Sequence, residues 1–97
     1  MRVIEKEMLR AILGGRDWSK DNTSVTIDRD YRDFVDVRLH GNHIATVKLR
    51  EGRGCIVKPN IDTLLNYPTR TTMSRLRALG VNVCTRKGEV MLNGAAL

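Results

Sequence analysis

The sequence predicts an α+β fold: an N-terminal helix, a small antiparallel sheet, two further helices and a C-terminal β-hairpin, in a winged-helix-like order. Apolar residues recur with a helical period over residues 2 to 13, and from residue 24 the period changes to two, which is typical of strands. Proline and glycine then divide the second half of the chain into short segments. The 97 residues are expected to form a single domain, 1–97, with a modest core.

The first predicted helix covers residues 2 to 13. Its apolar stripe consists of Ile4, Met8, Ala11 and Ile12. Glu5, Lys6 and Arg10 are expected to point away from the core. The pair Gly14-Gly15 ends the helix, because glycine adopts the left-handed backbone conformation readily. Trp18 follows in a polar turn segment, where we expect it to cover the edge of the core.

A three- or four-stranded antiparallel sheet is predicted for the middle of the chain. It begins with a short strand at residues 24 to 27. Residues 34 to 40 and 43 to 50 then form a hairpin around a Gly41-Asn42 turn. In its second arm Ile44 is expected on the same polar face as Thr46 and Lys48. A turn at residues 51 to 54 and a strand at 55 to 59 complete the sheet.

The C-terminal segment predicts two helices and a hairpin. Asn60 is a candidate N-cap for a short helix through Leu65, which Pro68 prevents from continuing. A second helix over residues 69 to 79 is capped by Thr69 or Thr71 and ends at Gly80. Strands at residues 81 to 85 and 90 to 92 form the hairpin.

The net charge of +6 lies entirely in the second half of the chain. Residues 1 to 47 hold eight basic and eight acidic residues, whereas residues 48 to 97 hold nine and three. An uneven basic charge indicates a polyanionic partner, although small basic proteins can also owe their charge to solubility alone.

The predicted helix at residues 69 to 79 has two faces. Its core stripe consists of Thr72, Met73, Leu76 and Leu79. Its other side is rich in arginine and hydroxyl groups, which suit phosphate, although an ordinary solvated face would look similar. With the hairpin as a wing, we expect DNA binding, with the helix in the major groove. The residues expected to contact DNA phosphates are Arg70, Arg75, Arg77, Arg86 and Lys87, with Thr71 and Ser74 beside them, and the reading of bases is left open.

Two other binding modes remain open. A basic sheet could follow a nucleic-acid backbone, but one Phe and two Tyr offer little stacking to single strands, so a duplex or a protein is favoured. The basic residues around that sheet are Arg38, His40, Lys48, Arg50, Arg53 and Lys58. Alternatively, the arginines pair with carboxylates of a protein partner, with exposed groups near Trp18 or Tyr67 as anchors.

No catalytic motif, cofactor site or metal site is predicted. His40, His43, Cys55 and Cys84 lack the close spacing of zinc modules. Two cysteines, the lack of a secretory signal and the lack of a membrane-length apolar run favour a cytoplasmic, non-enzymatic protein that does not bind membranes.

Several stretches resemble a family of short proteins encoded by tailed bacteriophages. They are "MRVIEKEMLRAILGGRDWSKDNTSV", "VRLHGNHIA" and "YPTRTTMSRLRALGVNV" followed by "KGEVMLNG". Each motif is short, and their order along the chain carries the resemblance. The resemblance implies a phage source. Small phage proteins commonly bind nucleic acid or host machinery, so the resemblance also implies an alternative function: inhibition of a bacterial protein such as a polymerase, nuclease or defence complex.

Overall fold

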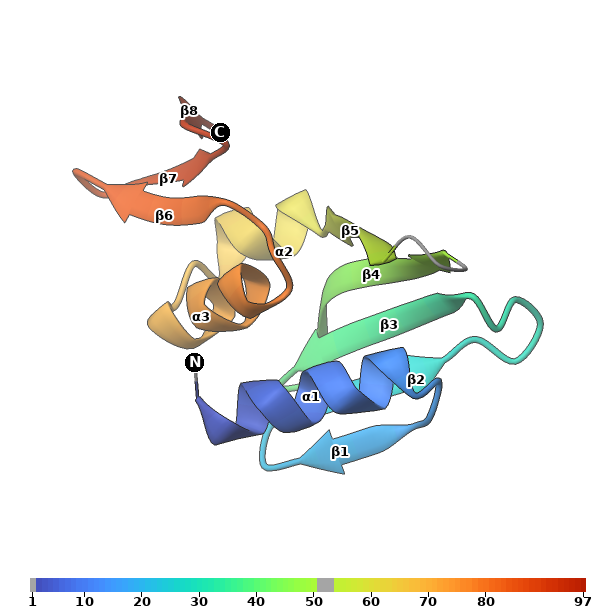
Figure 1. Cartoon of the computed structure of the whole chain (residues 1–97). Coiled ribbons are helices and arrows are strands. Elements are labelled where there is room, and N and C mark those ends of the chain that lie inside the picture. Colours follow the sequence, from blue (N-terminus) through green and yellow to red (C-terminus); the bar gives the residue numbers. More distant parts are fainter. Residues whose placement is uncertain (1, 51–53) are drawn as a thin grey trace.

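A computed structural model describes residues 2–50 and 54–97 and confirms an α+β architecture with antiparallel sheets (Figure 1). Helix α1 (Val3–Leu13) leads into a five-stranded sheet in the order β1-β2-β3-β4-β5. Two helices, α2 (Ile61–Asn66) and α3 (Arg70–Ala78), then lead to a second sheet of three strands. The strands of the first sheet are β1 (Trp18–Lys20), β2 (Thr23–Ile27), β3 (Phe34–Leu39), β4 (Asn42–Arg50) and β5 (Gly54–Pro59). Those of the second are β6 (Val83–Arg86), β7 (Glu89–Leu92) and β8 (Ala95–Ala96).

The helices cover one face of the five-stranded sheet. The core joins apolar residues of that face, such as Val35 and Val37, to Met8 of α1, Leu64 of α2 and Leu76 of α3. Val83 and Val90 of the second sheet belong to the same buried cluster. The opposite face carries alternating, partly exposed polar side chains. This pattern is typical of an antiparallel sheet packed on one side.

The first sheet has more strands than predicted. Strand β1 lies in the segment expected to be a polar turn, and it pairs Trp18 with Val25 through a two-residue turn in which Asp21 has φ 53°. Three residues are too few to show a period of two, which explains why the sequence did not indicate this strand. Trp18 is half-buried against the core, as expected.

The central hairpin is shifted by one residue from its prediction. Its turn consists of His40 and Gly41, both with positive φ, which is the conformation of a type I′ turn. A β-bulge at Val37/Arg38 leaves Ile44 as the extra residue of β4, and Ile44 is buried. The expectation that Ile44 lies on the polar face is therefore wrong. The turn predicted at residues 51 to 54 falls largely on 51–53, outside the described residues.

Helix α1 follows its predicted stripe except at Glu5, which is buried with 2% of its surface exposed. The expectation that Glu5 points away from the core is wrong because three donors surround its carboxylate. The backbone N–H of Arg2 donates to Oε1 at 3.3 Å. The Ser74 hydroxyl and the Arg75 guanidinium donate to Oε2 at 2.6 Å and 2.7 Å. Glu5 therefore caps α1 and also joins α1 to α3.

The pair Glu5–Arg75 also reaches the sheet. Arg75 is 6% exposed, and its Nε donates to the hydroxyl of Thr23 in β2 at 3.0 Å. Burial raises the pKa of Glu5, but the hydrogen bonds from Ser74, Arg75 and Arg2 and the charge of Arg75 together lower that pKa below its ordinary value of 4.5. Glu5 is therefore ionised and satisfied inside the protein.

Removal of one partner of this ion pair should be strongly destabilising. We expect Arg75→Met to lower the free energy of unfolding by about 3–5 kcal/mol, because Glu5 would remain as a buried, unpaired charge. Urea unfolding followed by circular dichroism measures the change. The matched control is Arg70→Met on the exposed side of the same helix, which should change stability by about 0.5 kcal/mol or less. Equal effects of the two substitutions would contradict the structural role of Arg75.

Because the folded-state pKa of Glu5 is lowered, its contribution to stability is present above the unfolded value of 4.5 and is lost as pH falls through the folded value. Glu5→Gln should therefore be less stable than the unsubstituted chain at neutral pH. We expect that difference to shrink as pH falls below 4.5. Unfolding free energies measured from about pH 3 to pH 7 test this linkage. Glu7→Gln is the control. Glu7 lies on the same helix as Glu5 and forms an exposed ion pair with Lys20 of β1, so this substitution removes an equal charge. If the stability difference between Glu5→Gln and the unsubstituted chain stayed constant from about pH 3 to pH 7, the lowered pKa of Glu5 would be contradicted.

Candidate nucleic-acid interface

Helix α3 forms where the sequence predicts a helix, and its caps explain both ends. The hydroxyl of Thr69 accepts a hydrogen bond from the backbone N–H of Thr72 at 3.1 Å, so Thr69 is the N-cap of the two candidates. Beyond the last turn, Gly80 has φ 93°, a left-handed conformation that favours glycine. The predicted core stripe is confirmed, since Thr72, Met73, Leu76 and Leu79 are all buried.

Two of the residues expected at a phosphate site make internal contacts instead. Arg75 and Ser74 both donate to Glu5. Thr71 on the same helix is half-buried. The expectation that Arg75 lies on an exposed face is therefore wrong, and we leave Arg75 out of the proposed interface. Local spacing could not indicate this, because the acid that neutralises Arg75 is 70 residues away in the sequence. Ser74 is half-buried and still lines the pocket described next.

Arg70 and Arg77 remain exposed and lie on one side of α3. Seven residues correspond to nearly two full turns, so the two side chains differ by about 20° around the helix axis. Together with Arg2 and Thr85 they line an open pocket of about 400 Å³. The Nε of Arg77 donates to the backbone oxygen of Val83 at 2.8 Å, which fixes the base of its guanidinium against β6. We call this pocket the arginine pocket, and its lining residues are Arg2, Pro68, Arg70, Met73, Ser74, Arg77 and Thr85.

The structure does not present α3 as a free recognition helix. Its exposed residues are Arg70 and Arg77, while the rest of the helix is buried or half-buried against α1, β4 and β6. A recognition helix needs a wide exposed face to enter the major groove. The narrow exposed strip of α3 suits contact with a backbone phosphate at its surface instead.

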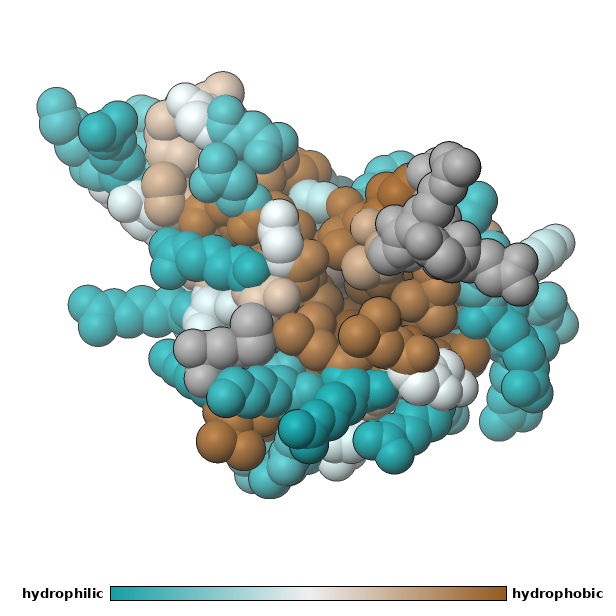
Figure 2. All heavy atoms as spheres, in the orientation of Figure 1, coloured by the Kyte–Doolittle hydropathy of each residue, from teal (hydrophilic) through white to brown (hydrophobic). Residues whose placement is uncertain are grey.

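The C-terminal hairpin places the other two predicted residues at its tip. Lys87 and Gly88 have φ 51° and 80°, so they form a two-residue type I′ turn between Arg86 and Glu89. The expected hairpin is present, and β8 adds a third strand that the sequence did not indicate. Figure 2 shows hydrophilic side chains gathered over the end of this hairpin. Arg86 and Lys87 are both exposed.

The local charge around these residues is strongly uneven. Glu89 is the one acid among residues 70 to 97, against five basic residues. Within the described residues, no ion pair involves Arg2, Arg70, Arg77, Arg86 or Lys87. By contrast, the pocket lined by Arg29 and Arg32, between the segment after α1 and the β2–β3 loop, is also lined by Asp17 and Asp28. The arginine pocket therefore has the unbalanced positive charge that an anion requires.

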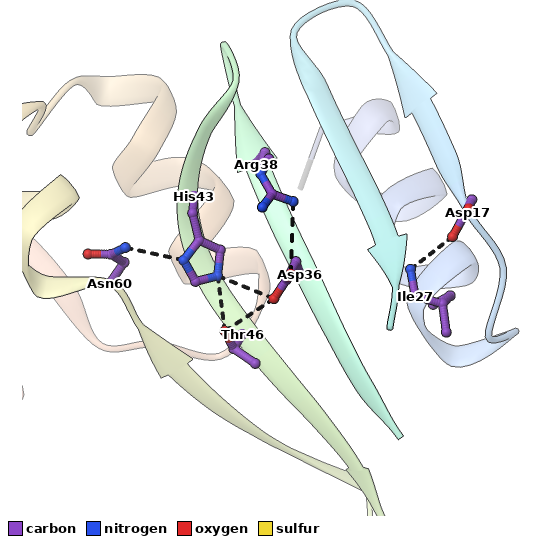
Figure 3. A network of polar contacts seen from close by, with 7 residues as sticks. All are labelled: Asp17, Ile27, Asp36, Arg38, His43, Thr46 and Asn60. Atoms are coloured by element: carbon purple, nitrogen blue, oxygen red, sulfur yellow. Dashed lines mark hydrogen bonds and ion pairs between the residues drawn. The ribbon is translucent and has the colours of Figure 1, made fainter. Parts of the chain in front are cut away.

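A polar network occupies the open face of the sheet (Figure 3). The side-chain amide of Asn60 donates to Nδ1 of His43 at 3.2 Å, and Nε2 of His43 lies 3.0 Å from the Thr46 hydroxyl and 3.5 Å from a carboxylate oxygen of Asp36. The Asn60 Oδ1 accepts from the N–H of Thr63 and caps α2, so this network anchors α2 to β4. Residues 2–50 and 54–97 contain no group of three or more His, Cys, Asp or Glu side chains that could hold a metal ion.

Arg2 and Thr85 line the arginine pocket but are not among the residues that the sequence predicts to contact DNA. Arg2 precedes the first helix, whereas the other lining residues lie at residues 68 to 85, and only the packing of α1 against α3 brings them together. No sequence signal marks this contact. Of the alternative basic sheet, Arg53 lies outside the described residues, and Arg38 is 3.9 Å from the carboxylate of Asp36.

Comparisons with known proteins identify the family. None of the helices that the structure describes is long and apolar enough to cross a membrane. No curated protein and no solved structure matches the chain. A family model described as "Kyanoviridae Gp96 protein" matches residues 1–96, which confirms the resemblance to proteins of tailed phages. The chain therefore belongs to the Kyanoviridae Gp96 family of cyanophage proteins.

Proposed function

We propose that this phage protein binds nucleic acid, with DNA as the expected form, through contacts to backbone phosphates and without enzymatic activity. The arginine pocket holds one or two phosphates, and Arg86 and Lys87 at the hairpin tip contact a neighbouring stretch of backbone. Such binding would take place in the cytoplasm of the infected cell. Base reading through a helix inserted in the major groove is not part of the proposal, because α3 is too deeply packed.

One observation carries this proposal: Arg2, which precedes α1, and Arg70 and Arg77 on α3 line one open pocket, and no carboxylate of the described residues lines it. Arginine is the side chain best suited to phosphate, because its planar fork donates two parallel hydrogen bonds. The bond from Arg77 to Val83 holds one of these groups in place before any ligand arrives. Less side-chain freedom is then lost on binding, which favours affinity.

The arginine pocket can be tested by removal of the charges of Arg2 and Arg70, whose side chains make no ion pair within the described residues. Arg2→Gln/Arg70→Gln should weaken binding to an oligonucleotide of about twenty residues by tenfold or more, since each charge-assisted hydrogen bond contributes on the order of 1.5 kcal/mol. The negative slope of log affinity against log salt should become shallower, by about 1.8 for duplex DNA and by about 1.4 for a single strand. Fluorescence anisotropy at several salt concentrations gives both values.

The matched control is Arg29→Gln/Arg32→Gln, which removes the same charge from the pocket that also contains Asp17 and Asp28. This variant should keep its affinity and its salt slope close to those of the unsubstituted chain. Equal losses in both double variants would mean that net charge alone governs binding. Absence of binding to duplex and single-stranded DNA at about 50 mM salt would overturn the proposed function.

A second candidate function is inhibition of a bacterial protein. An open groove of about 360 Å³ between β5 and the C-terminal elements has mixed walls, which include the apolar residues Val57, Leu79 and Val81. Figure 2 shows that apolar side chains also reach the surface in the middle of the face that it draws. A phage protein that carries exposed arginines and a groove with apolar residues in its walls has the side chains that anchor protein interfaces.

Capture from a host lysate after nuclease treatment separates the two functions. A nucleic-acid-binding protein should lose its partners on nuclease treatment, whereas an inhibitor should retain one protein in fixed ratio. Retention that depends on the groove should be lost in Cys55→Glu, because Cys55 lines it. Cys84→Glu, at the other exposed cysteine, is the control and should retain the partner. Retention in both variants would argue against the groove.

A further inference from the structure

A second pocket lies next to the arginine pocket, on the other side of the segment that enters α3. It has a volume of about 300 Å³ and is enclosed by the β3–β4 turn, α2 and the start of α3. Leu39 and Ile44, 4% and 1% exposed, form an apolar floor. This size is at the lower end of the range of about 300–1,000 Å³ for ligand pockets, so the pocket suits a single small ring system.

The rim of this pocket is aromatic and polar. Tyr67, with 53% of its surface exposed, lies at the rim with His40 and Asn42. Thr69 and Thr72 also line it, and their hydroxyls bond to each other at 2.9 Å. In the part of the chain that the structure describes, no hydrogen bond involves the side chains of His40, Asn42 or Tyr67. An apolar floor beneath unpaired donors and acceptors is typical of a site for a planar, polar ring.

Residues of one short segment, 67 to 73, line the two pockets in alternation. Pro68, Arg70 and Met73 line the arginine pocket, whereas Tyr67, Thr69 and Thr72 line the second pocket. Around the helix axis Thr72 lies about 100° from Met73 and about 160° from Arg70, so the two pockets open on different sides of one helical turn. Their separation is therefore on the order of 10 Å, the diameter of a helix with its side chains. A nucleotide presents a ring and a phosphate over a similar span.

We propose that the pocket at Tyr67 holds one nucleobase of a single-stranded nucleic acid whose phosphates lie on the arginine pocket. This inference rests on the proposed function and names its substrate as a single strand. In a duplex the bases are stacked and paired, so a pocket between a helix and a turn can receive only a base that has left the stack. The ring of Tyr67 stacks on the base, and the side chain of Asn42 offers both a donor and an acceptor to its edge.

The sequence pointed toward duplex or protein partners because aromatic residues are few. In the structure, however, one exposed tyrosine lies beside an apolar floor, and this is enough to bind one base of a single strand. Tyr31, the other tyrosine, is exposed on the β2–β3 loop, where it meets Phe34 edge-to-face with ring centroids 6.4 Å apart. It lines neither pocket, so it provides a matched control.

The test compares an oligothymidylate with an abasic oligomer of equal length, which carries the same phosphates and no bases. The unsubstituted chain should bind oligothymidylate more tightly. Tyr67→Ala should weaken oligothymidylate binding by about fivefold to 150-fold, the loss that corresponds to the stacking of one base, and leave abasic binding unchanged. Tyr67→Phe should restore binding because it keeps the ring, and Tyr31→Ala should have no effect. Arg2→Gln/Arg70→Gln should weaken binding to both oligomers.

The outcomes separate this inference from the proposed function. Equal binding of both oligomers, or equal losses in Tyr67→Ala for both, would overturn the base pocket and leave phosphate binding in place. Binding to neither oligomer, with one host protein retained after nuclease treatment, would overturn both. A second readout comes from the methyl groups of Leu39 and Ile44, whose NMR resonances should move upfield with oligothymidylate and stay in place with the abasic oligomer.

Discussion

The buried pair of Glu5 and Arg75 is the contact on which the arrangement of the helices depends. A charge inside a protein is stable only when it is paired and its remaining hydrogen-bonding groups are satisfied. Here the carboxylate receives donors from Arg2, Ser74 and Arg75, and Arg75 also reaches Thr23. One ionic contact thus connects α1, α3 and the sheet.

This contact also sets the rotation of α3 about its axis. Arg75 lies about 140° from Arg70 and about 160° from Arg77 around the helix. Once Arg75 points into the core toward Glu5, the other two arginines must face outward on the opposite side. The inward arginine therefore determines where the outward arginines stand. It also holds α1 beside α3, which places Arg2 at the same pocket.

The sequence predicted the α+β class, α1, α2, α3 and the central and C-terminal hairpins because each leaves a local signal. These signals depend on neighbouring residues alone. They are the helical period, the period of two residues in strands, the N-caps at Asn60 and Thr69, and Gly80 with its left-handed backbone. The order of several short motifs along the chain indicated the phage family. The three-residue strand β1, the bulge at Ile44 and the burial of Glu5 depend on contacts between distant segments, so spacing could not indicate them. For the same reason the exposed face of Arg70 and Arg77 was predictable, whereas the inward position of Arg75 and the contribution of Arg2 were not.

The 70-residue separation between Glu5 and Arg75 has a consequence for the order of folding. During synthesis α1 and the five-stranded sheet leave the ribosome before α3 exists. Until Arg75 has been synthesised, Glu5 must either remain in water or be buried without its cation. Burial of the unpaired charge would cost several kcal/mol of free energy. The early segments therefore cannot complete their packing alone. Closure of so long a loop is also slow compared with local helix formation. The native core forms only when the C-terminal third of the chain supplies the positive charge that its first helix requires.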